Sequence, residues 1–404
     1  MASSAAPKMT SKPAKRASHM AAALGLFFLC GLASTAAVAE DGLQAGSSIE
    51  RHWTSNALDS DQAIPDWYTL LRGSLQKQFG GDEANATLGA EIQATRYDTV
   101  SIEDDRALAL SAQVFRRLSP ALELRGTLTY RLSSEGDDLP IGPLTLGMRT
   151  QKQVFSAAGQ IGIDLGNATS LILDIADSFE KTGATRFEGN LLSPARLDPD
   201  LNRAQVGARL TRTLGQFSFG AYGSALLLSV EKLGSPPVAL SLEQYTLRGE
   251  LAYSAADGST LGLALGGEFL RGADDIYQRL RPTWQVTFAK KLPHTLELRG
   301  TYFGRYETLD SDDPLASWLQ RAELELGAKL REKLTFASGV FIEAKENLLF
   351  ENVERKRGVY AELTCEATAS TAIVFRVDFS KTFKTVIDEH QSTVDAFIGL
   401  RAKI

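Results

Sequence analysis

The 404-residue sequence has few of the features that would hold a chain in a membrane as a helix. Beyond the N-terminal region, no stretch approaches the roughly 18 consecutive apolar residues that a spanning helix requires. The mean hydropathy of −0.11 is ordinary for a soluble protein. Strands that alternate apolar and polar residues give a similar average even when half of each strand faces lipid. Any residence in a membrane is therefore expected to be through strands.

The first 39 residues have the three parts of a secretory signal peptide. A membrane anchor is the weaker alternative, because the apolar run is short and ends in small residues. A lipid anchor at Cys30 is disfavoured, because Leu29 stands where such signals generally have a small residue. We expect cleavage after residue 39, a short segment over 40–46 and one domain over 47–404. The signal comprises basic Lys8, Lys12, Lys15 and Arg16, an apolar run over 21–32, and Ala37-Val38-Ala39 before Glu40.

Cysteine and histidine are also scarce, and acidic residues slightly outnumber basic ones. Only Cys365 would remain after cleavage, which excludes an internal disulfide. Lys and Arg number 43 against 49 Asp and Glu, and no basic block follows the signal, which argues against nucleic-acid binding. His52, His294 and His390 lie beside no obvious Ser or Asp constellation. We therefore expect no catalytic residue, metal or cofactor, and a hydrolase is a remote alternative.

What the sequence has in abundance is alternation of apolar and polar residues. From about residue 47 onward, this alternation recurs in runs of ten to fourteen residues. In the run over 121–132, Leu122, Leu124 and Leu128 fall on one face, while Glu123 and Arg125 fall on the other. Soluble sandwiches also alternate, but their strands are usually five or six residues long, whereas a tilted membrane strand needs about 9–11. Many long strands without helices therefore predict a closed antiparallel transmembrane barrel, since closure removes exposed edges.

The connections alternate between short turns and longer polar segments, as in barrels with short periplasmic turns and longer extracellular loops. Seventeen strands can be counted from Trp67, and a chain entering from the periplasm needs one more, which residues 47–57 can supply. We predict eighteen strands, with sixteen next; the faces are poorly separated over 217–230 and 334–346. The expected turns are 118–120, 165–167, 214–216, 256–258, 292–293 and 331–333, and the expected loops are 133–150, 181–202, 231–242, 308–315, 347–356 and 383–390.

Aromatic residues stand near the ends of many of these runs, as expected where rings lie at the level of lipid headgroups. The high strand propensity of aromatics is the alternative explanation. The last run ends at Ile404 and is similar to the terminal signal read by the barrel-assembly machinery, although such signals usually end in Phe. The aromatics concerned are Trp67, Phe79, Tyr130, Phe179, Tyr245, Tyr253, Trp284, Phe288, Tyr302, Trp318, Phe375 and Phe379.

The start of the expected mature chain, residues 48–57 followed by Asp66-Trp67-Tyr68, has a short strand with a Thr-x-Asn-like ending, a polar loop and a second strand. This pattern resembles a family of Gram-negative β-barrel porins often called the second β-barrel porin group. The resemblance covers the architecture of the mature chain, but its motif is short and permissive. It implies an outer-membrane barrel, sometimes associated with polysaccharide export, and it implies no catalytic residues.

Barrels of 16–18 strands are wide enough for an aqueous channel, so we expect a porin-like channel for small polar solutes or saccharides. Its partners would be outer-membrane lipid, lipopolysaccharide and the assembly machinery. An export, assembly or structural barrel with an occluded lumen is the alternative.

The acidic segments 103–105, 135–138 and 310–313 are candidate sites for divalent cations or, more simply, solvated loop tips. Charged residues either select solutes or merely pair for stability; those expected to line the pore are Arg125, Arg131, Arg209, Arg248, Glu250, Arg279, Arg281, Glu297, Arg299, Arg321, Glu323 and Glu325, with Arg72 and Glu91 on the same expected face.

Overall fold

The computed structural model describes residues 42–58, 63–141, 144–190, 192–231, 241–272, 277–293, 295–308, 316–348, 352–385 and 389–403. The expected signal peptide lies outside these residues. In the described part of the chain, no helix is long and apolar enough to cross a bilayer. Two short 3₁₀ helices, η1 (Ser101–Glu103) and η2 (Glu188–Asn190), stand among long strands.

The strands follow one another along the chain and pair antiparallel with their sequence neighbours. Their bounds are β1 (Leu43–Thr54), β2 (Asp66–Gly80), β3 (Ala84–Tyr97), β4 (Asp105–Ser119), β5 (Leu122–Ile141), β6 (Leu144–Gly166), β7 (Thr169–Thr182), β8 (Arg186–Phe187), β9 (Leu201–Leu214), β10 (Phe217–Val230), β11 (Leu242–Ser254), β12 (Thr260–Gly272), β13 (Gln278–Leu292), β14 (Leu296–Glu307), β15 (Ser317–Arg331), β16 (Leu334–Asn347), β17 (Val353–Glu366), β18 (Thr371–Lys384) and β19 (Glu389–Lys403).

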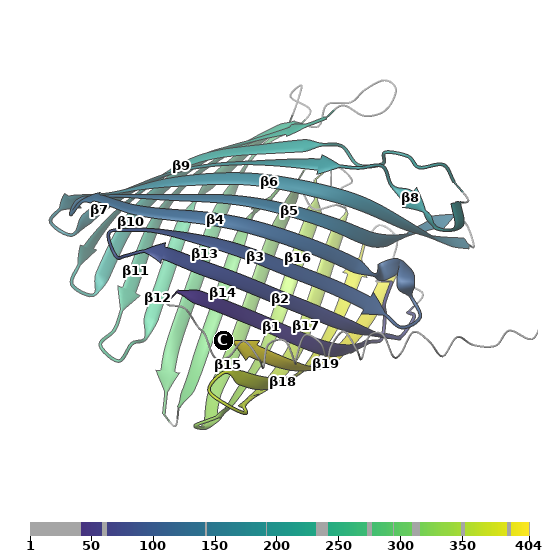
Figure 1. The fold of residues 1–404 in the computed structure, drawn as a ribbon. Coiled ribbons are helices and arrows are strands. Elements are labelled where there is room, and N and C mark those ends of the chain that lie inside the picture. Colours follow the sequence, from purple (N-terminus) through teal and green to yellow (C-terminus); the bar gives the residue numbers. More distant parts are fainter. Residues whose placement is uncertain are drawn as a thin grey trace, which may run out of the picture.

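The sheet closes on itself because the first strand pairs with the last. The register of β1 and β19 runs from Gly46 opposite Lys403 to Thr54 opposite Asp395, and the two strands lie side by side in Figure 1. The two-residue β8 pairs with Met148 and Arg149 in the first part of β6, and β7 pairs directly with β9. The described residues therefore form a closed antiparallel barrel of 18 strands, as the alternation predicts. Both strands with poorly separated faces are present, as β10 and β16.

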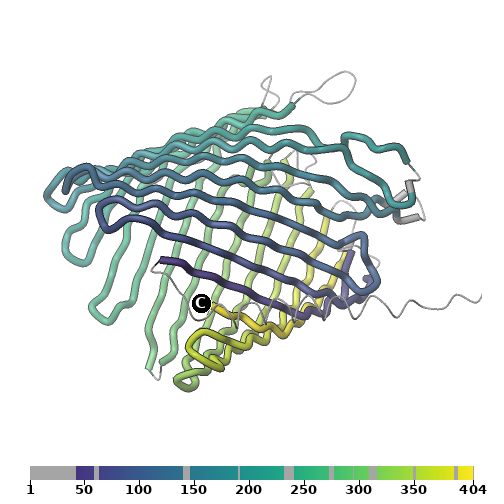
Figure 2. Tube along the Cα trace, viewed as in Figure 1, coloured from purple at the N-terminus to yellow at the C-terminus, as the bar shows by residue number. Residues whose placement is uncertain are grey.

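Tight turns gather at one edge of the barrel, here called the short-turn end, and can be followed along the left of Figure 2. Gly166 and Gly215 have φ of +79° and +61° at two of these turns, a conformation that glycine adopts without steric cost. The connection from β7 to β9 and other long segments lie at the opposite edge, the long-loop end. β1 begins at Leu43, four residues before the expected start of the barrel, and residues 43–46 pair with β2.

The prediction of a loop over 133–150 is wrong. β5 and β6 continue through it as an extended hairpin, paired from Ser133 opposite Lys152 to Ile141 opposite Leu144. Ion pairing supports the extension, since Lys152 lies 2.9 Å from Glu135. β8 adds to its edge. The physical reason for the difference is that a strand projecting beyond lipid has no apolar side, so its polar, Gly-containing sequence looks like a loop.

Candidate functional site: the polar face of the barrel

Cross-strand register divides the wall of the barrel into two faces. Residues paired across strands share a face, and following the pairs from Glu50 through all eighteen strands returns to Glu50 on the same side. We call this side the polar face. The opposite side, the apolar face, carries large side chains that are 60–71% exposed: Leu128, Ile175, Leu247, Leu265, Leu280 and Ile342.

All twelve charged residues expected to line a pore lie on the polar face. Arg72 and Glu91 lie there too. The buried polar side chains of the strands share this face, among them Glu50, Ser133, Thr150, Glu268, Thr283 and Gln391. Such crowding is expected where side chains converge on the concave side of a cylinder.

One group of these residues lies on β9, β10 and β11. The Tyr222 ring has the guanidinium groups of Arg209 and Arg248 at 5.0 and 4.7 Å from its centre. Both arginines also contact the Glu250 carboxylate, at 3.2 and 3.1 Å. Two cations therefore share one carboxylate and one aromatic ring, an arrangement that restrains both guanidinium groups.

A longer network begins on β14 and β15. Arg299 contacts Glu297 at 2.8 Å and Glu325 at 3.5 Å. Arg321 contacts Glu323 at 2.8 Å and Glu343 at 3.2 Å, and its guanidinium lies 4.8 Å from the Phe341 ring. Each arginine therefore faces two carboxylates.

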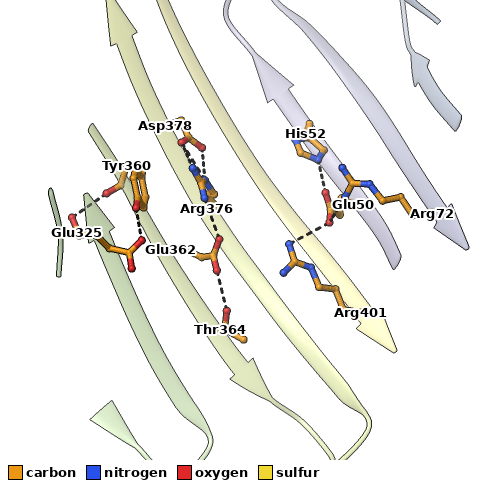
Figure 3. Close-up of polar contacts among 11 residues, drawn as sticks. Glu50, His52, Arg72, Glu325, Tyr360, Glu362, Thr364, Arg376, Asp378 and Arg401 are labelled. Carbon is orange, nitrogen blue, oxygen red and sulfur yellow. Dashed lines mark hydrogen bonds and ion pairs between the residues drawn. The ribbon is translucent and has the colours of Figure 1, made fainter. Parts of the chain in front are cut away.

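The network continues across β17 and β18, as Figure 3 shows. The Tyr360 hydroxyl donates to Glu325 at 2.6 Å, and the Arg376 guanidinium lies 4.4 Å from the Tyr360 ring. Arg376 also contacts Asp378 at 2.7 Å and Glu362 at 3.5 Å. The Tyr360 ring lies against Gly339, where an added Cβ would come within 2.5 Å of the ring. Glycine on β16 thus makes room for the tyrosine that links β15 to β18.

Glu50 connects the two ends of the chain. Its carboxylate lies 3.2 Å from Arg72 of β2 and 3.4 Å from Arg401 of β19, and His52 Nε2 lies 3.0 Å away (Figure 3). The Glu50 residue is only 2% exposed. Charge pairing therefore spans the seam at which the barrel closes.

The remaining predicted residues have fewer charged partners. Arg125 pairs with Glu123 at 3.0 Å, and Arg279 lies over the Tyr277 ring. Arg131 is exposed on the polar face of β5. In the middle of β4 and β6 this face carries small side chains, including Ala107, Ala109, Ser111, Ser156 and Ala158. The charged network therefore covers only part of the circumference.

The ends of β14, β15 and β16 stay paired with one another and with β17, but they separate from β13 and fold over the polar face. Register between β13 and β14 stops at Trp284 opposite Gly304, although β13 continues to Gln278. Beyond this point Tyr306 and Trp318, which alternation assigns to the apolar face, are 4% exposed and pack with Leu228, Leu242 and Leu270, which lie on the polar face of β10, β11 and β12. We call residues 304–308, 316–320 and 344–348 the shelf.

Arg281 fastens the shelf to β13. Its guanidinium lies 5.3 Å from the Trp318 ring and binds both Glu346 oxygens, at 2.7 and 2.8 Å. At the far side, Arg203 of β9 donates to the Thr308 carbonyl at 2.6 Å. The shelf thus reaches across the polar face from β13 to β9.

Sequence reasoning missed the shelf and misplaced Trp318. An interfacial position was expected for this residue, but the structure buries it. The available signal was in the strand over 217–230, where Leu226, Leu227 and Leu228 occur together. Leucines on both faces obscure the alternation. On the polar face, Leu228 packs with Tyr306 and Trp318 of the shelf, and Leu226 packs against this cluster. Trp67, Phe79, Phe179, Tyr245, Tyr302 and Phe375 are exposed on the apolar face, and their position at the level of lipid headgroups stays a prediction.

Acidic residues expected in loops are partly brought together. Oxygen atoms of Glu103, Asp137 and Asp138 lie within 4.8 Å of one another. Burial, followed by the charges of Asp137 and Asp138, raises the pKa of Glu103 to about 8. The segment 310–313 lies outside the described residues, as does His294, while His390 contacts the Phe383 ring.

The comparison with protein-family models gives no match, and the comparison with curated proteins gives none. Similar folds occur among solved structures. The copper transporter OprC is 9% identical with a TM-score of 0.52, over 90% of this chain and 81% of that chain. OccK2 (OpdF) of Pseudomonas aeruginosa is 11% identical with a TM-score of 0.51, over 90% and 98%. The outer membrane protein opdK of the same organism is 9% identical with a TM-score of 0.50, over 90% and 99%. The chain therefore has the fold of an outer-membrane β-barrel.

Proposed function

We propose that the protein is a porin-like channel of the outer membrane, through which small polar solutes, including saccharides, diffuse passively. The observation that carries this proposal is the constancy of the two faces around the whole barrel. An apolar exterior suits lipid, and a polar interior suits water. The solved barrels of similar fold include a copper transporter, which is compatible with a transport role.

The proposed channel would be narrowest between the shelf and the arginine–carboxylate network. The shelf covers the polar face of β9 to β13, and the network lies on β14 to β2. A solute passing between them meets guanidinium and carboxylate groups on one side and the folded strand ends on the other. Paired charges of both signs favour polar solutes over a single class of ion.

Single-channel recording tests the proposal. The mature protein, refolded and inserted into a planar bilayer, is expected to give stable conductance steps that oligosaccharides block. Folding is established beforehand by circular dichroism and by the heat-dependent gel mobility of the barrel. A folded protein that inserts and yet conducts no ions contradicts the channel.

A second function follows from the shelf itself. If the shelf and the long loops fill the interior, the protein is an occluded barrel with an export, assembly or structural role. This alternative would be favoured if the wild-type protein conducts no ions and the variant Arg281→Gln, whose shelf is less firmly held, does conduct them. Arg281 is the informative position because it contacts both Trp318 and Glu346.

A further inference from the structure

The inward bend of the shelf leaves a hollow in the apolar face next to it. The hollow has a volume of about 620 Å³ and lies between β14 and β19. Its wall on β14 to β16 includes Tyr302, Ala322, Ile342 and Ala344, all from the apolar face. A recess of this kind is unusual on a barrel wall, since the outward-facing side chains of a regular wall diverge.

Three cations line the opposite side of the hollow. Arg355 and Arg357 lie on β17, and Lys381 lies on β18, directly opposite Arg357 in the register. All three are exposed on the apolar face near the long-loop end. Like charges placed opposite each other in a strand pair repel, and the repulsion grows beside an apolar surface.

Among the described residues, none of these three cations has a carboxylate partner. Lys381 lies 5.9 Å from the Phe379 ring. Glu343, the carboxylate in the lining, belongs to the polar face and pairs with Arg321 at 3.2 Å. Elsewhere on the apolar face at the long-loop end, Arg51 pairs with Asp98, and Arg271 with Glu243. Within the described residues, the cluster is therefore a concentration of positive charge on which an anionic ligand can bind.

We propose that this hollow binds a phosphorylated glycolipid of the outer leaflet, with Arg355, Arg357 and Lys381 on its phosphate groups. Arginine binds phosphate oxygens in a bidentate fork, and lysine adds a point charge. Tyr302, Ile342, Ala322 and Ala344 give the acyl chains an apolar surface beside the phosphates. The inference rests on the proposed residence in the outer membrane, whose outer leaflet would meet the long-loop end.

Native mass spectrometry of the full mature protein in detergent tests the site with lipid A as the probe. We expect retention of bisphosphorylated lipid A, and at least about tenfold weaker retention of the dephosphorylated form, because the charge-assisted contacts to the phosphate groups are lost. The triple variant R355Q/R357Q/K381Q should lose retention to the same extent. The matched control is Arg106→Gln, because Arg106 is an exposed apolar-face arginine near the same end.

Two further measurements distinguish a lipid phosphate from a free phosphate ion and separate the lipid site from the channel. Inorganic phosphate at millimolar concentration should not displace lipid A if the acyl surface contributes; displacement would show a free-anion site and overturn the proposal. Equal retention by the wild type and a folded triple variant would also overturn it. Conductance of the same protein is recorded in parallel. A barrel that retains lipid A but conducts no ions contradicts only the channel. A barrel that conducts ions but does not retain lipid A contradicts only the lipid site.

Discussion

At the scale of single residues, Glu50 shows how charge is accommodated in the barrel. Its carboxylate is buried, but Arg72 and Arg401 keep 41% and 46% of their side chains exposed. A buried carboxylate with two such partners avoids the cost of an unpaired charge. The partners can still turn to water when the carboxylate is removed, so the expected loss is smaller than for a fully buried triad.

We predict that Glu50→Gln lowers the free energy of unfolding by about 1–3 kcal/mol, the cost of leaving charged hydrogen-bonding groups poorly matched. Equilibrium urea unfolding in phospholipid micelles measures the change. The control is Glu297→Gln, whose partner Arg299 is largely exposed, and which should change stability by about 0–1 kcal/mol. Equal effects of the two substitutions would show that burial at the seam has no special weight.

At the scale of elements, the shelf combines apolar packing with the ion pair between Arg281 and Glu346. Tyr306 and Trp318 lie with ring centres 4.9 Å apart, edge to face, and Trp284 lies where β13 and β14 separate. The β14–β15 pair is continuous up to Glu307 opposite Ser317, and the β15–β16 pair up to Ser317 opposite Asn347, so backbone pairing holds the three strand ends together.

Truncation of Trp318 to alanine is expected to cost about 3–5 kcal/mol of shelf packing and to raise the channel conductance, because the strand ends detach from β10 to β12. Planar-bilayer recording and urea unfolding provide the two measurements. Trp67→Ala is the matched control, since Trp67 is 47% exposed on the apolar face. A destabilised Trp318→Ala barrel with unchanged conductance would mean that the shelf does not narrow the passage.

A second element, η1, docks on the extended β5–β6 hairpin. An added Cβ at Gly136 or Gly147 would collide with Ile102, so these glycines allow the close approach that half-buries Glu103. A carboxyl whose pKa is about 8 in the folded protein, against an ordinary 4.5, favours the docked state when protonated. The contribution is complete below about pH 4.5 and is lost as the pH rises through 8.

Hydrogen exchange of the backbone amides around residues 101–105 and 136–148 should therefore become faster between pH 5 and pH 8.5, beyond the intrinsic pH dependence of exchange. Glu103→Gln removes the titrating group and should abolish this additional change. Amides in the β10–β11 pair serve as the internal reference. An identical pH profile in the variant would assign the effect to other acidic groups.

At the scale of the whole molecule, the polar face balances its charges. Removing one partner should therefore tilt the ion preference in a predictable direction. Arg299→Gln leaves Glu297 and Glu325 uncompensated and should shift the reversal potential toward cation selectivity. Glu250→Gln leaves Arg209 and Arg248 and should shift it toward anions. Both shifts should shrink from 0.1 M to 1 M salt, because the Debye length falls from about 10 Å to about 3 Å. Shifts of the same sign would contradict the assignment of these residues to the pore.

The regular part of this architecture was predictable, and the irregular parts were not. Alternation depends on neighbours two residues apart, so residues such as Arg125 and Glu297 are placed on their face by local sequence alone. The shelf depends on strand ends meeting strands far away in the chain, and Trp318 has the same local surroundings whether it faces lipid or a folded interior. Similarly, Glu135 and Lys152 reveal an extended hairpin only once their register is known. Alternation with a period of two residues reports on local structure and does not predict contacts between segments that are distant in the sequence.

Because β1 pairs with β19, the strands form a closed ring, whereas the covalent chain is open and has both its ends at this seam. Gly46 faces Lys403 at the short-turn end, so a short linker from the end of β19 to the start of β1 would join them without crossing the wall. New termini at Gly215, in the turn between β9 and β10, would also lie at the short-turn end. Such a circular permutant would keep every strand pair and still have to close a ring, but its last pairing would join β9 to β10.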